Sequence, residues 1–257
     1  METDRAIEIV QALADGVDPY TGERFASDSP YQQADTMRAL HLALEGLAAP
    51  FDAKDSLGRT PLLMASKEGR GRNEDMALWL LDLGADPNVQ PKESFETVMF
   101  NAAFNGRSRL VKALVKRDAR TDGRGQEGWT PLHAAVMRGD TNIVGELIRA
   151  GCAVDPTTGR GFTPLLLGVH QGLGDQTAMV DLLVGAGADI ERRDKNGHSA
   201  LDIAHRRLQK AEKDEQGTRE SRDANVSNAK ALLGRIKHHY KQDRGRGDKP
   251  KAAPRGQ

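Results

Sequence analysis

Hydrophobic positions fall into short helical stretches that alternate with Gly-containing turns along most of this chain. In four stretches apolar residues recur at i, i+1, i+4 and i+5, which places them on one buried face of a helix. The four stretches are residues 76–81, 110–115, 143–148 and 179–184. Each follows another apolar stretch of about two helical turns. The pattern therefore predicts pairs of short antiparallel helices.

A block that begins at Thr or Ser opens each pair and returns at a nearly fixed spacing. Its Thr or Ser occupies positions 60, 97, 130, 163 and 199, so the steps are 37, 33, 33 and 36 residues. The Thr is suited to cap the first helix, and Pro often follows it at the first helical position. A Gly nine residues after the Thr suits a sharp helix end, at positions 69, 106, 139 and 172. A period of this size predicts stacked repeats that share one continuous core.

The ends of the second helices show a further regularity with one departure, and two repeats are longer than the others. Three of them stop at a Gly, at positions 84, 151 and 187. Asp118 stands at the corresponding position of the second repeat, and a residue of this type can adopt the left-handed conformation at some cost. The first and fourth repeats carry three extra residues near 69–73 and 172–176, which should lengthen the turn between their helices.

The Thr-Pro-Leu-His-x-Ala block, followed by Gly and a helix with paired Leu, resembles the ankyrin repeat. The resemblance covers about five repeats within residues 51–236 and is strongest over 128–153. The second repeat lacks the Pro and His, and the fifth reads Ser-Ala-Leu-Asp over 199–202. The resemblance implies an all-α solenoid of helix-turn-helix units with β-turn fingers. Members of this family bind proteins through the finger tips and the inner helices.

We expect three parts in the chain. Residues 1–49 form an N-terminal helical capping module, or alternatively a docking module, and residues 50–236 form an ankyrin-repeat domain of five repeats. An insertion over 206–223 interrupts the last repeat, and its mixed charge indicates an exposed helix or a flexible loop. Residues 237–257 are a basic tail that we expect to be disordered.

Composition indicates the expected location of the protein but not its function. The 257 residues have a formal net charge of zero, but eight Lys or Arg against two Asp from residue 235 onward give that end a charge of +6. The one cysteine, Cys152, excludes an intrachain disulfide and stands where a small apolar residue fills a turn. No apolar run approaches 18 residues and no signal peptide opens the chain. We therefore expect a cytoplasmic, monomeric protein that does not enter a membrane.

Motifs for catalysis or for metal and nucleotide binding are missing from the sequence. It contains no G-x-x-x-x-G-K-[ST] phosphate loop and no G-x-S-x-G nucleophile motif. The seven histidines lack the spacing of a zinc site, and His133 is the structural His of the repeat block by the family resemblance. We therefore expect no enzymatic activity, no cofactor and no bound metal.

The family resemblance assigns partner contacts to the finger tips and to the residues before the mid-repeat Gly. Carried onto this chain, the predicted partner-binding residues are Arg59, Glu96, Phe104, Asn105, Glu127, Trp129, Met137, Arg138, Arg160, Phe162, His170 and His198. Trp and other aromatic residues dominate interface hot spots, which favours Trp129 and Phe162 as anchors. The alternative is that both rings pack on neighbouring fingers and stiffen the array.

The sequence therefore favours a non-catalytic protein–protein interaction module, acting as an adaptor, an inhibitor or a regulatory subunit. An effector that acts on a foreign protein would use the same surface. The alternative is a nucleic-acid-associated protein, in which the basic tail and the Arg206-Arg207 pair contact phosphates.

Overall fold

The chain divides into two compact units, Met1–Ala153 and Val154–Gln257. The computed structural model describes residue 17 and residues 54–55, 57–67, 72–91, 97–171, 176–213 and 219–245. The helical module predicted for residues 1–49 lies outside the described residues, apart from position 17. Glu96 of the predicted contact set lies outside them too.

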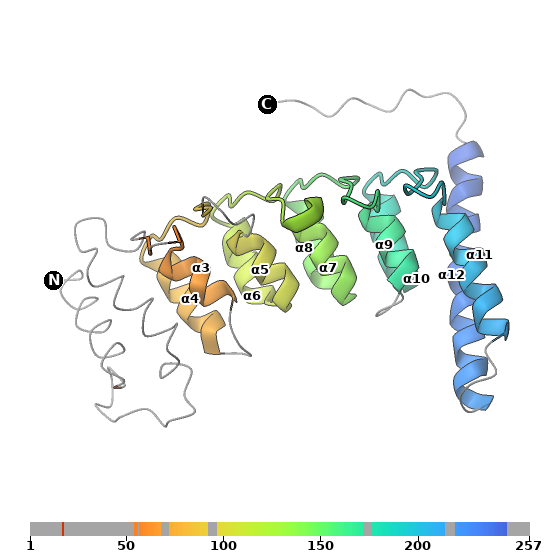
Figure 1. The fold of residues 1–257 in the computed structure, drawn as a ribbon, viewed down its shortest axis with the longest axis horizontal. Helices are drawn as coiled ribbons and strands as arrows, with labels where there is room; N and C mark the ends of the chain where they lie inside the picture. Colours follow the sequence, from red (N-terminus) through yellow and green to blue (C-terminus); the bar gives the residue numbers. More distant parts are fainter. Residues whose placement is uncertain are drawn as a thin grey trace. The chain divides into compact units, whose positions relative to one another are not determined.

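The first unit is built from helix pairs (Figure 1). We call the first helix of each pair the inner helix and the second the outer helix. The pairs are α3 (Pro61–Lys67) with α4 (Arg72–Asp82), α5 (Val98–Asn105) with α6 (Ser108–Val115), and α7 (Pro131–Arg138) with α8 (Thr141–Arg149). A short 3-10 helix, η2 (Gln126–Gly128), precedes α7. Each inner helix contacts the next inner helix, and each outer helix the next outer one, as stacked repeats require.

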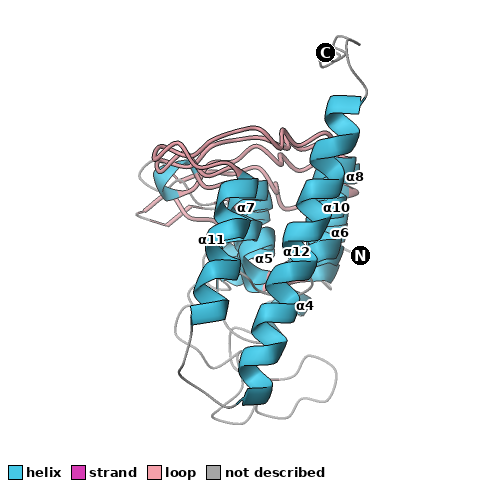
Figure 2. Cartoon of the chain, turned by 90° about the vertical axis from the view of Figure 1, so that its right-hand side faces the viewer, coloured by secondary structure: helices cyan, strands magenta, loops and turns pink. Residues whose placement is uncertain are grey.

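The second unit contains two further pairs, α9 (Pro164–Gln171) with α10 (Gln176–Gly185) and α11 (Ala200–Lys213) with α12 (Arg219–Gly245). The long helices α11 and α12 lie side by side, as Figure 2 shows. Helix α11 also packs on α9, and α12 packs on α10, so the stacking rule of the first unit holds here.

Threonine side chains start the inner helices, as the sequence predicts. Thr97 Oγ1 accepts from the Phe100 N–H (3.1 Å), and Thr163 Oγ1 accepts from the Leu166 N–H (3.2 Å). At Thr130 the cap is reciprocal, because His133 Nδ1 also accepts from the Thr130 N–H (3.3 Å). His133 is fully buried, so its role in the described structure is to hold the helix start.

The helix ends follow the predicted turn chemistry, including its one exception. Asp118 adopts φ 52°, the left-handed conformation that Gly84, Gly151 and Gly187 adopt in the other repeats. The prediction for Asp118 is confirmed. Gly106 ends α5 with φ 71°, and a Cβ at this position would lie 2.6 Å from Arg138 Nε. Gly106 is therefore required both by its backbone angle and by the side chain packed against it.

The core of each unit lies between the inner and the outer helices. Its outer-helix contribution is the predicted stripe, with no exposed surface at Leu110, Val111, Leu114, Ile143, Val144 or Leu147. Burying one such side chain stabilises the fold by roughly 1.5–3 kcal/mol. Short helices of this length are marginal alone, so the repeats depend on this shared burial.

The described parts of the insertion follow the helical alternative, whereas the start of the tail differs from the expectation. Helix α11 continues without a break to Lys213, and α12 begins at Arg219, so the described parts of the 206–223 insertion extend the two helices. Helix α12 also continues to Gly245, so residues 237–245 are helical where the sequence predicts disorder. The physical reason is packing: α12 lies along α11 and α10, which compensates for its polar composition.

Candidate functional site

Four described fingers, each before an inner helix, close through one repeated hydrogen bond. The N–H of the first turn residue donates to the carbonyl oxygen four positions later, in the pairs Asp55–Arg59, Gly125–Trp129, Thr158–Phe162 and Asp194–His198. Four predicted contact residues therefore occupy the same position of the same turn, directly before the capping Thr or Ser. The backbone holds this position, so its side chain is not needed for closure.

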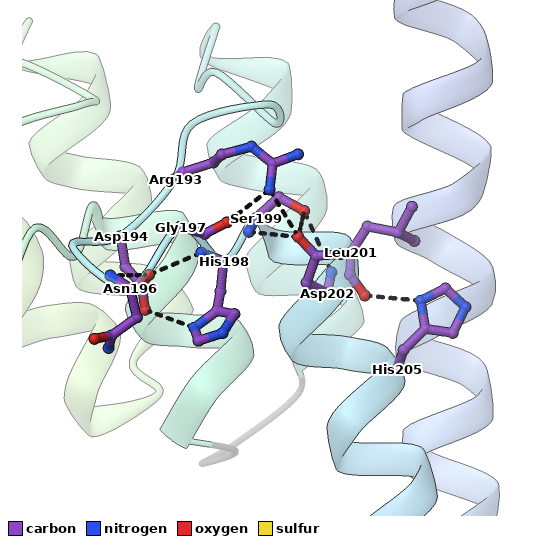
Figure 3. Close-up of polar contacts among 9 residues, drawn as sticks. All are labelled: Arg193, Asp194, Asn196, Gly197, His198, Ser199, Leu201, Asp202 and His205. Carbon is purple, nitrogen blue, oxygen red and sulfur yellow. Dashed lines mark hydrogen bonds and ion pairs between the residues drawn. The ribbon is translucent and has the colours of Figure 1, made fainter.

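The finger of the fifth repeat is fixed by a buried carboxylate (Figure 3). Asp194 Oδ1 accepts from the N–H groups of Asn196 (2.8 Å) and His198 (2.9 Å), and Oδ2 lies 3.4 Å from His198 Nδ1. Burial pushes the pKa of Asp194 upward, but the bonds from His198 and Asn196 together hold it below its ordinary value. The carboxylate is therefore ionised near neutral pH and orients the His198 ring.

A second carboxylate joins this finger to the start of α11. Asp202 Oδ2 accepts from the Ser199 N–H (2.9 Å) and from Ser199 Oγ (2.7 Å), and the Arg193 guanidinium contacts the same oxygen (3.1 Å). The backbone and hydroxyl donors of Ser199, followed by Arg193, lower the pKa of Asp202. The finger and the inner helix are therefore a preformed frame for the side chains they carry.

Side chains of one repeat cap the inner helix of the repeat before it. The last carbonyl groups of an α-helix lack partners within the helix. Here they accept from guanidinium Nη1 atoms, in the pairs Arg107–Ala65 (2.6 Å), Arg138–Phe104 (3.2 Å) and Arg207–Val169 (2.7 Å). Asn105 Nδ2 adds bonds to the carbonyls of Ser66 (3.1 Å) and Lys67 (3.3 Å). The predicted contact residues Asn105 and Arg138 thus already have a structural task.

Among the described aromatic residues of the first unit, Phe104 is the most exposed. Its side chain is 45% exposed and its ring stacks on Phe100, with centroids 6.1 Å apart. Trp129 is less exposed than Phe104: it is half-buried, and its ring centroid lies 5.8 Å from that of His133. Met137 is also half-buried. Phe104 therefore offers a partner more apolar surface than Trp129, the anchor favoured by sequence.

The charged finger residues differ in their surroundings. Arg59 pairs with the buried carboxylate of Asp55 (2.7 Å), which ties its side chain into its own finger. Glu127 is exposed in a left-handed conformation (φ 55°), and Arg160 is exposed. The structure does not bring these residues into a described cavity.

In the second unit the structure gathers three predicted residues around one groove. Phe162, His170 and His198 line a cavity of about 620 Å³, between the finger tips and helices α11 and α12. The Phe162 and His170 rings meet edge to face, with centroids 5.3 Å apart. A volume of this size lies within the range of ligand-binding pockets.

Helix α11 supplies three cations to the same groove: Arg206, Arg207 and Lys210. The sequence pattern places Arg206 and Arg207 in an insertion and predicts no role for Lys210. A stretch of mixed charge does not indicate which of its side chains face a cavity. Arg207 is fixed by bonds from Nη1 to the Val169 carbonyl (2.7 Å) and to Gln176 Oε1 (2.6 Å). Burial lowers its pKa, but an arginine stays protonated in proteins.

The described residues give little support for a metal site, a reactive thiol or a membrane span. They contain no group of three His, Cys, Asp or Glu side chains placed to hold a metal ion. Burial raises the pKa of the Cys152 thiol to about 11, so the reactive thiolate is scarce at neutral pH. No described helix is both long enough and apolar enough to cross a membrane.

Comparison with known proteins agrees with the architecture. Residues 99–194 match a family model of ankyrin repeats in three copies, and residues 70–115 match a second ankyrin-repeat model. Neurogenic locus notch homolog protein 1 of Xenopus laevis is 31% identical over 156 residues, and that of Homo sapiens is 32% identical over 155 residues. Each match covers 56% of this chain and 6% of the relative. The similarity therefore concerns a small part of those proteins.

The repeat spacing, the paired helices with their capped starts and the two family matches lead to one assignment. Ankyrin repeats are protein-interaction modules, and the family is in general non-catalytic. Residues 70–194 of this chain are ankyrin repeats.

Proposed function

We propose that this chain is a non-catalytic interaction module that binds another protein, as an adaptor, an inhibitor or a regulatory subunit. The observation that carries the proposal is the groove of the second unit, where Phe162, His170 and His198 line one cavity. These residues come from a finger, an inner helix and a second finger, the elements through which ankyrin repeats bind proteins.

The rigidity of this frame supports the proposal. Hydrogen bonds to Asp194 and Asp202 hold the last finger and the start of α11 before any partner arrives. A partner that docks against a preformed face loses little free energy to ordering that face. Phe162 supplies an aromatic side chain at the groove, and aromatic residues dominate interface hot spots.

Affinity capture from native lysate tests this function. The full-length chain is compared with the variant Phe162→Ala/His170→Ala, and a captured protein should be retained at least about tenfold less by the variant. The matched control is Leu182→Ala, which removes a 37% exposed apolar side chain from the outer helix α10. Thermal unfolding of all three proteins verifies that the substitutions leave the fold intact.

The proposal fails if every captured protein is retained equally by the three chains. Loss in the Leu182→Ala control but not in the groove variant would move the binding surface to the outer helices. Nuclease treatment in a parallel capture separates direct protein partners from proteins that arrive on nucleic acid.

A further inference from the structure

The charges around the groove of the second unit are strongly one-sided. Arg206, Arg207 and Lys210 line it from successive turns of α11. Asp194 is the one carboxylate among the described residues that line it. That side chain is buried and already accepts hydrogen bonds from its own finger. The groove therefore presents more positive than negative charge to a ligand.

Two of these cations are exposed to a ligand, and hydrogen bonds hold the third in place. Arg206 and Lys210 are exposed, and neither forms an ion pair with another of the residues described. Arg207 is held by Val169 and Gln176 through Nη1, while a guanidinium carries three further N–H donors on its other nitrogens. A fixed guanidinium loses little freedom when it binds a carboxylate.

The rest of the lining suits a polypeptide rather than a bare anion. Phe162 and Ala229 contribute apolar surface, and Asn196, Asn225 and Asn228 contribute side-chain amides. An amide both donates and accepts, so it can bond the N–H and C=O groups of an extended backbone. For a single nucleic-acid strand one expects stacking rings along a basic groove, and Phe162 is the one such ring besides the histidines among the described lining residues.

We propose that this groove binds an acidic segment of the partner protein, with Asp or Glu carboxylates on Arg206, Lys210 and Arg207 and an apolar side chain against Phe162. The inference rests on the proposed function and adds the chemical class of the partner. Cations on one face and carboxylates on the other would also speed the encounter of the two proteins.

A peptide array tests the class of partner directly. The array displays random short peptides in three groups, rich in Asp and Glu, rich in Lys and Arg, or uncharged, and is probed with the labelled full-length chain. The wild-type chain should favour the acidic group. Arg206→Glu/Lys210→Glu should lower binding to acidic peptides by about tenfold or more, because like charges now face each other.

The control variant carries the same change of charge elsewhere. Lys230→Glu/Lys237→Glu alters two exposed lysines of α12 that do not line the groove. It should keep the acidic preference. Arg206 and Lys210 are exposed, so their substitution leaves the core intact, and Arg206→Gln/Lys210→Gln repeats the test if the Glu variant unfolds.

The remaining outcomes each overturn the inference. No preference for acidic peptides, or an equal loss in both Glu variants, would show that the groove does not select them. Competition by a single-stranded oligonucleotide as effective as that of an acidic peptide would assign the cations to nucleic acid. If the protein captured through Phe162 and His170 is not displaced by acidic peptides, the proposed function stands and this inference alone fails.

Discussion

At the scale of single residues, the repeats are joined by side chains that satisfy backbone groups of their neighbours. Arg107 is the clearest case, since its side chain is buried and its Nη1 lies 2.6 Å from the Ala65 carbonyl oxygen. A buried carbonyl without a partner costs more than a typical hydrogen bond contributes. These bonds therefore fix how one repeat seats on the previous one.

Arg107→Ala should lower the free energy of unfolding by about 1–3 kcal/mol, because it leaves a buried carbonyl without its donor. Urea unfolding of both proteins measures the change. The control is Arg109→Ala, whose side chain is 67% exposed and pairs with an exposed Asp75. That pair should contribute about 1 kcal/mol or less. Equal losses at the two positions would refute the role given to Arg107.

Asp118→Gly should raise the free energy of unfolding by up to about 1 kcal/mol, because φ 52° strains any residue with a Cβ. Lys116→Gly is the matched control two positions earlier, where φ is −62°. There Gly gains nothing from its freedom and should cost roughly 0.5–1 kcal/mol. Thermal unfolding that shows the same sign for both substitutions would contradict the argument.

At the scale of elements, the long helix α12 is tied to α10 by one carboxylate. Asp181 Oδ1 accepts from Arg235 Nε (2.5 Å) and lies 2.6 Å from His239 Nε2, while Oδ2 pairs with the same guanidinium. The hydrogen bonds from Arg235 outweigh burial and hold the pKa of Asp181 below its ordinary value. His239 belongs to the predicted tail. Its contact with Asp181 therefore holds the first turn of that tail against α10 as part of the helix.

Asp181→Asn should lower the free energy of unfolding at neutral pH by about 1 kcal/mol or less, since the pair is partly exposed. A carboxylate whose pKa is lowered by folding stabilises the fold at pH values above its ordinary pKa. This stabilisation is lost as the pH falls through the pKa of the folded state. Urea unfolding should therefore give converging stabilities for the two proteins below roughly pH 4. The control Asp243→Asn, an exposed change on α12, should have little effect at any pH.

Sequence patterns predicted the elements better than they predicted the groove. The Thr caps and Gly stops are local, so the block at Thr130 or the stop at Gly151 could be read from neighbouring residues. Arg207 reaches Val169 across 38 positions, and His239 reaches Asp181 across 58. Such contacts depend on stacking. The grouping of Phe162, His170 and His198 follows the family resemblance, and their role in binding stays a prediction.

At the scale of the whole chain, the net positive and net negative charge lie in different parts of the sequence. The formal net charge is zero, while the residues from Arg235 onward carry +6 and the rest carries −6. Such a chain has little repulsion between copies at neutral pH, and its sequence pI is about 7.1. Static light scattering should show net attraction near pH 7, weakened by added salt and reversed at roughly pH 9. Repulsion near pH 7 that salt does not change would contradict this expectation.

In the finger turns, the main chain closes the turn and the side chain at the last position remains exchangeable. Arg59, Trp129, Phe162 and His198 differ in charge, size and polarity, yet each sits in a turn closed by the same main-chain bond. Exchanging these four side chains should therefore change the surface that the fingers present and leave the turns closed. In such a stack, a new binding specificity would need new finger side chains and no new fold.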